Sequence, residues 1–221
     1  MMKRYSWLDD AAINQMSAIL RRGGVLAGSS DTVFGLLALA SNEDKQRLNA
    51  IKERSDKPYL VLARSLDEVK KLVVDGQLLQ IEKLLEQCWP GPLTVIFNPS
   101  FYAESLYAPF PSVPTRKWTI AIRVPKHAGL QKLLAQTGPL FSTSANKAGQ
   151  PTPTTLDQMD QSILNQVDGV VMDADGQSST LSAPSTIIDA TGDKLVMVRE
   201  GAYSKAELMS KLGEGDKRFE E

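Results

Sequence analysis

The sequence predicts a single α/β domain in which a twisted mixed sheet is flanked by helices. Short apolar segments of strand length recur along the chain, and several are separated by amphipathic segments of helical period, although not in strict βαβ units. No linker divides the apolar segments into two groups. The chain has 221 residues, 42% of them hydrophobic, which is ample for one core and marginal for two.

Helices are predicted where a capping side chain precedes an apolar stripe of period 3.6. The predicted starts are Asp9 or Asp10, Ser41, Ser65 with Glu68, and Ser204 with Glu207. One more helix carries Leu84 and Cys88, and Trp89-Pro90 must end it because proline cannot continue a helix.

Strands are predicted for short apolar runs bounded by polar or turn residues. They are residues 25–27, 59–63, 93–97, 119–124, 140–144, 169–172, 185–189 and 195–198. Residues 101–117 are rich in Pro, Ser and Tyr without periodicity, which predicts a long loop. The domain is expected to span residues 1–212, followed by a charged tail over 213–221.

The composition excludes several classes of protein. With 25 basic and 26 acidic side chains, the chain lacks the basic excess typical of a protein that holds a polyanion along a whole face. One cysteine and one histidine cannot build a Cys/His zinc site or an intrachain disulfide, which fits a reducing cytoplasm. No apolar run is long enough for a signal sequence or a membrane span, so we expect a cytoplasmic protein with no membrane partner.

The common nucleotide-binding and hydrolase motifs are missing. There is no GxxxxGK[ST] loop and no GxGxxG after a strand. A Ser-His-Asp triad would have to use His127, and nothing around it supports one. A bound nucleotide must therefore be held by another architecture.

The first candidate site is a cluster of cations at the end of the second helix. Lys52, Arg54 and Lys57 lie within six residues and are followed by Pro58. Lysine as a point charge and arginine as a planar fork suit a triphosphate. The alternative is a solvated helix C-terminus, where the helix dipole favours cations in any case.

The second candidate is Arg123 at the end of a predicted strand. Alternation places it on the same face as Thr119 and Ala121, whose small side chains leave room for an anion such as a substrate carboxylate. The alternative is an ordinary half-exposed strand whose arginine faces water.

The third candidate follows an apolar strand that emerges into Ser142, Ser144 and Asn146. Three uncharged hydrogen-bonding side chains at the end of a strand can line a nucleotide site. The alternative is a turn that satisfies its own backbone. Weaker candidates are Ser185 and Arg199, and a hydroxyl-rich loop over 28–36 that could instead be a simple turn capped by Asp31.

Taken together, seven segments resemble the YrdC/Sua5 family, the threonylcarbamoyl-AMP synthases, over residues 10–202. They are SSDTVFGL (29–36), KERSDKP (52–58), WPGPLTVIF (89–97), IAIRVPKH (120–127), STSANKAGQP (142–151), PSTIID (184–189) and VREGA (198–202). The resemblance implies a sheet curled around a large concave cavity. It also implies the formation of threonylcarbamoyl-AMP and pyrophosphate from ATP, L-threonine and bicarbonate, for modification of adenosine 37 in tRNAs that read codons beginning with A.

The resemblance also implies roles for individual residues. Lys52 and Arg54 would be catalytic. The ATP-binding residues would be Lys52, Arg54, Lys57, Ser142, Ser144, Asn146 and Arg199, and the threonine-binding residues would be Ser30, Thr32, Arg123 and Ser185. Mg²⁺ is expected to enter with ATP, without dedicated protein ligands. Expected partners are tRNA or the threonylcarbamoyl-transferase complex.

Two differences from the family pattern stand in the first segment. Ser29-Ser30 replaces the usual Pro-Thr, and Phe34 replaces a tyrosine. The chain has no room for the additional C-terminal domain of longer members. Two other functions remain open at this point: an RNA-binding module on the same scaffold, and a paralogue that acts on another carbamoyl compound.

Overall fold

The computed structural model describes residues 2–53, 58–107, 118–147, 149–153, 155–173, 183–213 and 218–219. Its strands are β1 (Arg4–Ser6), β2 (Leu26–Gly28), β3 (Gly35–Leu39), β4 (Leu60–Leu62), β5 (Leu93–Phe97), β6 (Ile120–Arg123), β7 (Leu140–Ser144), β8 (Gly169–Met172), β9 (Thr186–Asp189) and β10 (Val196–Arg199). The helices are α1 (Asp10–Leu20), α2 (Asn42–Lys52), α3 (Leu66–Leu72), α4 (Gln77–Cys88), α5 (Phe101–Tyr107), α6 (Ala128–Thr137), α7 (Gln161–Leu164), α8 (Lys205–Leu212) and a 3-10 turn (Leu156–Gln158).

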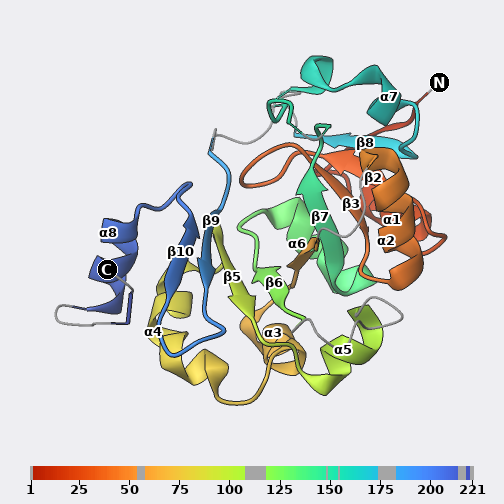
Figure 1. The fold of residues 1–221 in the computed structure, drawn as a ribbon. Coiled ribbons are helices and arrows are strands. Elements are labelled where there is room, and N and C mark those ends of the chain that lie inside the picture. Colours follow the sequence, from red (N-terminus) through yellow and green to blue (C-terminus); the bar gives the residue numbers. More distant parts are fainter. Residues whose placement is uncertain are drawn as a thin grey trace.

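All ten strands form one mixed sheet in the order β1-β8-β2-β3-β7-β4-β6-β5-β9-β10 (Figure 1). The sheet contains parallel pairs such as β4–β6 and β5–β9 and antiparallel pairs such as β3–β7 and β5–β6. The structure therefore confirms the predicted class, an α/β domain with a mixed sheet flanked by helices.

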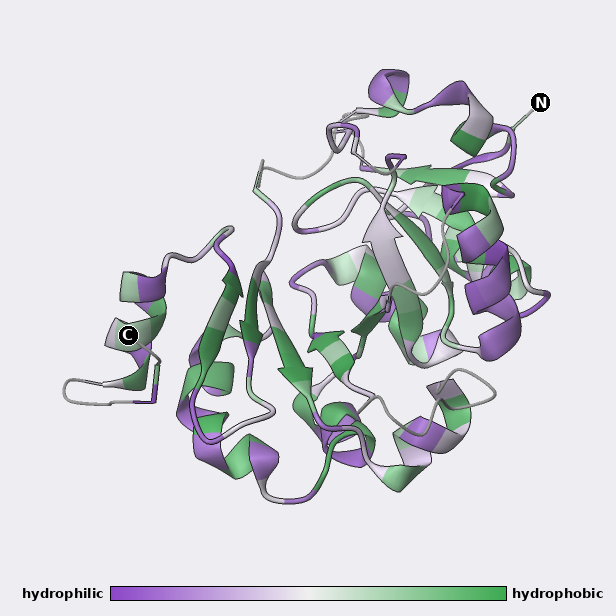
Figure 2. Ribbon diagram, in the orientation of Figure 1, coloured by the Kyte–Doolittle hydropathy of each residue, from purple (hydrophilic) through white to green (hydrophobic). Residues whose placement is uncertain are grey.

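Two apolar clusters cover the two faces of this sheet. The larger cluster packs α2, α3, α4 and α8 against strand residues such as Val61, Val95, Ile122 and Phe141. The smaller cluster packs α1 and α6 against the other face, around Leu62 and Leu140. In Figure 2 the strands are mostly hydrophobic, whereas α1 and α2 alternate between hydrophobic and hydrophilic residues, as expected for helices that pack with one side.

The predicted helix starts are confirmed by hydrogen bonds at their caps. Asp9, Ser41 and Ser65 each accept a hydrogen bond from the first turn of their helix, and Ser204 forms a full capping box with Glu207. His127 is half-buried and caps α6: its Nδ1 atom accepts from the backbone N–H of Leu130, 3.1 Å away, and its Nε2 atom lies 3.2 Å from Oδ1 of Asp173.

Strands β1 and β3 are not among the predicted strands, and one predicted loop is partly helical. β3 was missed because Gly35–Leu39 is apolar on both faces and lacks alternation, as is typical of a central strand. The prediction of a loop over 101–117 was wrong for 101–107, which form α5: Ser100 Oγ accepts the N–H of Ala103 and starts that helix. Residues 108–117 lie outside the described part of the chain.

The C-terminal region makes contact with the domain where it is described. The backbone N–H of Leu195 donates to the carbonyl of Arg218, 2.7 Å away, and the side chain of Phe219 is buried in the larger cluster. The proposed boundary at residue 212 stays a prediction. Within the described residues, no helix has the length and apolar character needed to span a membrane.

Candidate active site on the open face of the sheet

One face of the central strands is only partly covered. The register places Leu60 opposite both Ala121 and Ser142, and Ala121 opposite Ile96. These four residues are half-exposed, whereas their neighbours along the strands point to the other face and are buried, except for Thr143. We call the face that carries Leu60, Ile96, Ala121 and Ser142 the open face. It continues the face that α1 and α6 cover elsewhere.

On this face the side chains become polar where strand β7 passes from apolar to hydroxyl-bearing residues. Leu140 and Phe141 are apolar, and the strand then ends in Ser142, Thr143 and Ser144, a change that is visible along β7 in Figure 2. Ser142 and Ser144 lie on the same face because they are two residues apart. The structure therefore places both predicted serines together on the open face or at its edge.

Lys52 joins the end of α2 to the end of β7. Its side chain is 4% exposed, and Nζ donates to the carbonyls of Ser144, 2.6 Å away, and Asn146. Helix α2 ends directly after Lys52 because Glu53 adopts a left-handed conformation, with φ of 50°. Glu53 then pairs with Lys147 at 2.9 Å, which makes a second link between the two segments. The two carbonyls hold the ammonium at the end of β7, where it can donate to a nearby anion.

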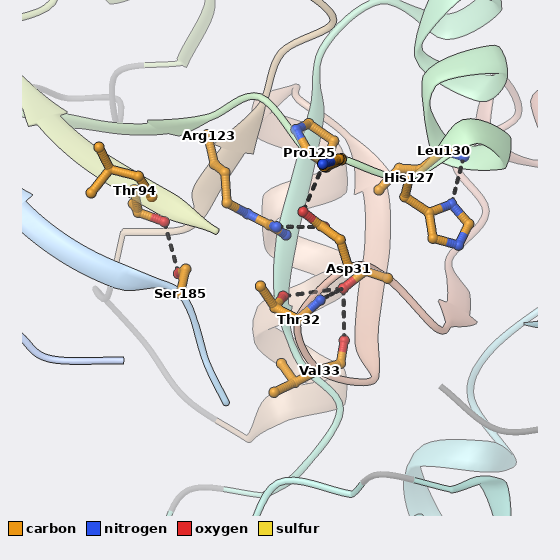
Figure 3. A network of polar contacts seen from close by, with 12 residues as sticks. Asp31, Thr32, Val33, Thr94, Arg123, Pro125, His127, Leu130 and Ser185 are labelled. Carbon is orange, nitrogen blue, oxygen red and sulfur yellow. Dashed lines mark hydrogen bonds and ion pairs between the residues drawn. The ribbon is translucent and has the colours of Figure 1, made fainter. Parts of the chain in front are cut away.

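Arg123 lies at the opposite end of the open face and has a charged partner. Its side chain is 2% exposed, and Nη1 donates to the Oδ1 atom of Asp31 at 2.6 Å. The Oδ2 atom of Asp31 accepts the backbone N–H of Lys126, 2.8 Å away. Figure 3 shows the Arg123 side chain directed toward Asp31. The Nε–H of Arg123 is buried and has no hydrogen-bond partner within the described residues, an arrangement that costs about 1–3 kcal/mol if no ligand supplies an acceptor.

Thr94 and Ser185 lie on the side of Arg123 away from Asp31 in Figure 3. The hydroxyls of Thr94 and Ser185 are 2.8 Å apart. Arg199 donates from Nη2 to the carbonyl of Ser185 at 2.7 Å and remains exposed. Desolvation lowers the pKa of its guanidinium from the ordinary value, but arginine stays protonated at neutral pH.

The hydroxyls of the first loop lie beside Asp31. The Oγ atoms of Ser30 and Thr32 are 3.2 Å apart, and Ser30 also donates to the carbonyl of Val33. Both residues are buried. Because Asp31 stands between them in sequence, its bonds to Arg123 and Lys126 hold this loop against the end of β6.

The structure thus forms two polar groups from the predicted site residues. One contains Lys52, Ser142, Ser144 and Asn146, and the other contains Ser30, Thr32, Arg123, Ser185 and Arg199. Arg54 and Lys57 lie outside the described residues. The roles of all these residues remain predictions.

Sequence reasoning missed Asp31 and Thr94 as site residues. From the sequence, Asp31 is predicted only as a turn cap, because no local pattern links it to Arg123, which lies 92 residues further along the chain. Thr94 gave no signal, because a threonine inside an apolar strand segment is ordinary.

A small pocket lies elsewhere, on the side of the larger apolar cluster. Its walls include Tyr59, Tyr107, Trp118 and Phe141. These aromatic side chains belong to the core or pack against it, so we place the candidate site on the open face, where the hydroxyls and cations gather.

These features define an α/β protein with a mixed sheet whose open face has cations and hydroxyls at both ends. The chain belongs to the Sua5/YciO/YrdC family, since the model of that family, described as "Telomere recombination", matches residues 18–201. Threonylcarbamoyl-AMP synthase of Vibrio cholerae is 34% identical over 194 residues, which cover 86% of this chain and 97% of the relative.

The longer relatives extend beyond this chain. Threonylcarbamoyl-AMP synthase of Bacillus subtilis is 30% identical over 93% of the chain, which spans only 58% of that relative's length. The crystal structure of P. abyssi Sua5 complexed with L-threonine superposes with a TM-score of 0.82 at 26% identity, covering 97% of this chain and 61% of that protein.

Proposed function

We propose that the chain is an L-threonylcarbamoyladenylate synthase, a nucleotidyltransferase. The observation that carries the proposal is the pair of polar groups at the two ends of one half-exposed sheet face. The product has an adenylate at one end and an amino-acid carboxylate at the other, so such a site must offer cations at two places. The names of the relatives from Vibrio cholerae and Bacillus subtilis support the same reaction.

The group around Lys52 would bind the triphosphate of ATP. Its ammonium is already oriented by the carbonyls of Ser144 and Asn146, so little reorganisation is needed when phosphate oxygens approach. Ser142 and Ser144 would donate to the nucleotide from the end of β7. Arg54 and Lys57 are proposed to complete this group.

The group around Arg123 would bind L-threonine. The Nε–H of the guanidinium is buried and has no partner in the part of the chain that the structure describes, and it would donate to the carboxylate. The hydroxyls of Ser30 and Thr32, which flank Asp31 in the chain, and of Ser185, which is paired with Thr94, would contact the rest of the amino acid. Arg199 is proposed to act on the ATP side.

The chemistry needs positioning more than a protein nucleophile. The neutral amino nitrogen of threonine would attack the carbon of CO₂ derived from bicarbonate and lose a proton to solvent, and an oxygen of the resulting carbamate would then attack the α-phosphorus of ATP. The bond to pyrophosphate breaks, and the residues around Lys52 would stabilise the charge that develops on the phosphate oxygens.

Mg²⁺ is proposed to enter with ATP. No set of three or more His, Cys, Asp or Glu side chains in the described part of the chain is arranged to hold a metal ion, so phosphate oxygens would supply most of its ligands. The product is proposed to serve the modification of adenosine 37 in tRNA, with tRNA or a threonylcarbamoyl-transferase complex as partner in the cytoplasm.

The test is release of pyrophosphate by the purified protein. We expect release that requires ATP, L-threonine and bicarbonate together, and a product with the mass of threonylcarbamoyl-AMP. Serine and valine serve as matched amino acids, because each lacks one group of threonine. Release that is indifferent to the amino acid would refute the substrate, and salt-sensitive RNA binding without turnover would indicate an RNA-binding module instead.

A further inference from the structure

We propose that Asp31 is a positioning residue for the amino-acid site. It holds the guanidinium of Arg123 so that the edge carrying Nε is presented to the carboxylate of the substrate. This inference rests on the proposed function, which assigns Arg123 to that carboxylate.

Asp31 is fixed by both of its oxygens. Oδ1 accepts from Arg123 and Oδ2 accepts from the backbone of Lys126, at 2.6 and 2.8 Å. The residue is 4% exposed, so water cannot readily replace either bond. The carboxylate therefore cannot rotate without losing a hydrogen bond, and it fixes the plane of the guanidinium that it contacts.

The pairing leaves one edge of Arg123 available. A guanidinium is a planar fork of five N–H donors, and it binds a carboxylate best through two parallel bonds. Asp31 accepts a hydrogen bond from Nη1 of Arg123, whereas the buried Nε–H of Arg123 has no partner within the described residues. Buried donors are nearly always satisfied in folded proteins, so this one indicates where a ligand's acceptor belongs.

Asp31 also couples the first loop to the arginine. Its neighbours Ser30 and Thr32 carry the hydroxyls assigned to the amino acid, and their own oxygens are 3.2 Å apart. Because Ser30 and Thr32 flank Asp31 in the chain, the bonds that fix Asp31 also fix the positions of these two hydroxyls. The Thr94–Ser185 pair lies on the other side of Arg123 in Figure 3, so the arginine stands between two sets of hydroxyls.

The competing explanation is an ion pair that only stabilises the fold. The two explanations differ in the substrate affected. A positioning residue for the amino-acid site changes the KM for threonine and leaves the KM for ATP alone, whereas a general loss of structure changes both.

The experiment compares Asp31→Asn with the matched control Asp44→Asn in the pyrophosphate assay. Asp44 is also a buried carboxylate, 5% exposed, but it lies on α2 and its partner is Ser41. For Asp31→Asn we expect the KM for L-threonine to rise about tenfold or more while the KM for ATP stays within about threefold. For Asp44→Asn we expect both to stay within about threefold. An unchanged KM for threonine, or an equal rise in both constants, would overturn the proposal.

A second variant covers the case in which Asp31→Asn does not fold. Asp31→Glu keeps the charge and displaces the carboxylate by one methylene group, and we expect the same selective rise in the KM for threonine.

Failure of the proposed function can be distinguished from failure of the role proposed for Asp31. If the unmodified protein shows no threonine-dependent release of pyrophosphate, the proposed function itself is wrong and this inference falls with it. If the unmodified protein is active and both variants have its KM for threonine, only the role of Asp31 is wrong.

Discussion

Lys52 and Arg123 are both buried cations beside the open face, and they are held in opposite ways. Lys52 is 4% exposed and donates to neutral carbonyls at the end of β7, whereas Arg123 is 2% exposed and is paired with the carboxylate of Asp31. The carbonyls of Ser144 and Asn146 fix the position of the Lys52 ammonium, whereas the carboxylate of Asp31 fixes the Arg123 guanidinium and neutralises part of its charge. We propose that a triphosphate binds beside the ammonium and that a single carboxylate binds beside the guanidinium.

The largest expected effect is on turnover when the charge of Lys52 is removed. Lys52→Met keeps most of the side-chain stem but removes the ammonium, so we expect kcat for pyrophosphate release to fall about 10²–10³-fold. Lys83→Met, at an exposed position on α4, is the control and should leave kcat unchanged. Turnover near the normal rate in Lys52→Met would show that this lysine does not act on the phosphates.

The next effect is on stability when the Arg123 pair is broken. Asp31→Asn leaves a buried guanidinium without its counter-charge, which typically lowers the free energy of unfolding by about 3–5 kcal/mol. The double variant Asp31→Asn/Arg123→Met should recover much of that loss, because no isolated charge remains. Denaturant unfolding measures both. If the double variant is no more stable than the single one, uncompensated charge is not the cause.

Removing the hydrogen bonds of Lys52 should lower the free energy of unfolding less than removing the ion pair between Asp31 and Arg123. Lys52→Met leaves two carbonyls without a donor, which costs about 1–3 kcal/mol. The same denaturant experiment gives this value beside that of Asp31→Asn. A larger loss for Lys52→Met than for Asp31→Asn would contradict the distinction between neutral and charged partners.

A smaller effect is expected at the hydroxyl pair beside Arg123. Thr94→Val keeps the shape of a side chain that is 2% exposed and removes its hydrogen bond to Ser185, so we expect a loss of about 1 kcal/mol in the free energy of unfolding. Thr143→Val, at a half-exposed position on β7, is the control and should change stability less. Equal losses would mean that the bond between the hydroxyls adds nothing.

Cys88 provides the third case, a buried ionisable group with no counter-charge in contact. Burial raises the pKa of its thiol from 9.0 to about 11, with a smaller opposing effect of Lys211. The neutral thiol therefore persists until the pH approaches 11, and alkylation by iodoacetamide at pH 8 should be about 10²-fold slower in the folded protein than in the unfolded chain. The rate should rise with pH toward 11. Equal rates in the folded and unfolded protein at pH 8 would contradict this expectation.

Some of the site was predictable because local rules decide it. Ser142 and Ser144 share a face since they are two residues apart on a strand, and the start of α2 could be predicted because Ser41 caps it. Arg123 could be assigned to a face of its strand for the same reason. Its partner could not be assigned, because Asp31 is 92 residues away and lies in a loop.

The sequence by itself determined the order of most strands and helices, their caps, and which candidate residues share a face. Periodicity and capping are local, so they can be recognised without knowing what an element packs against. The tertiary structure decided that β3 is a central strand, that residues 101–107 are helical, and that Lys52 meets β7 while Arg123 meets Asp31. These outcomes depend on strand order and register between distant segments, which no local pattern contains.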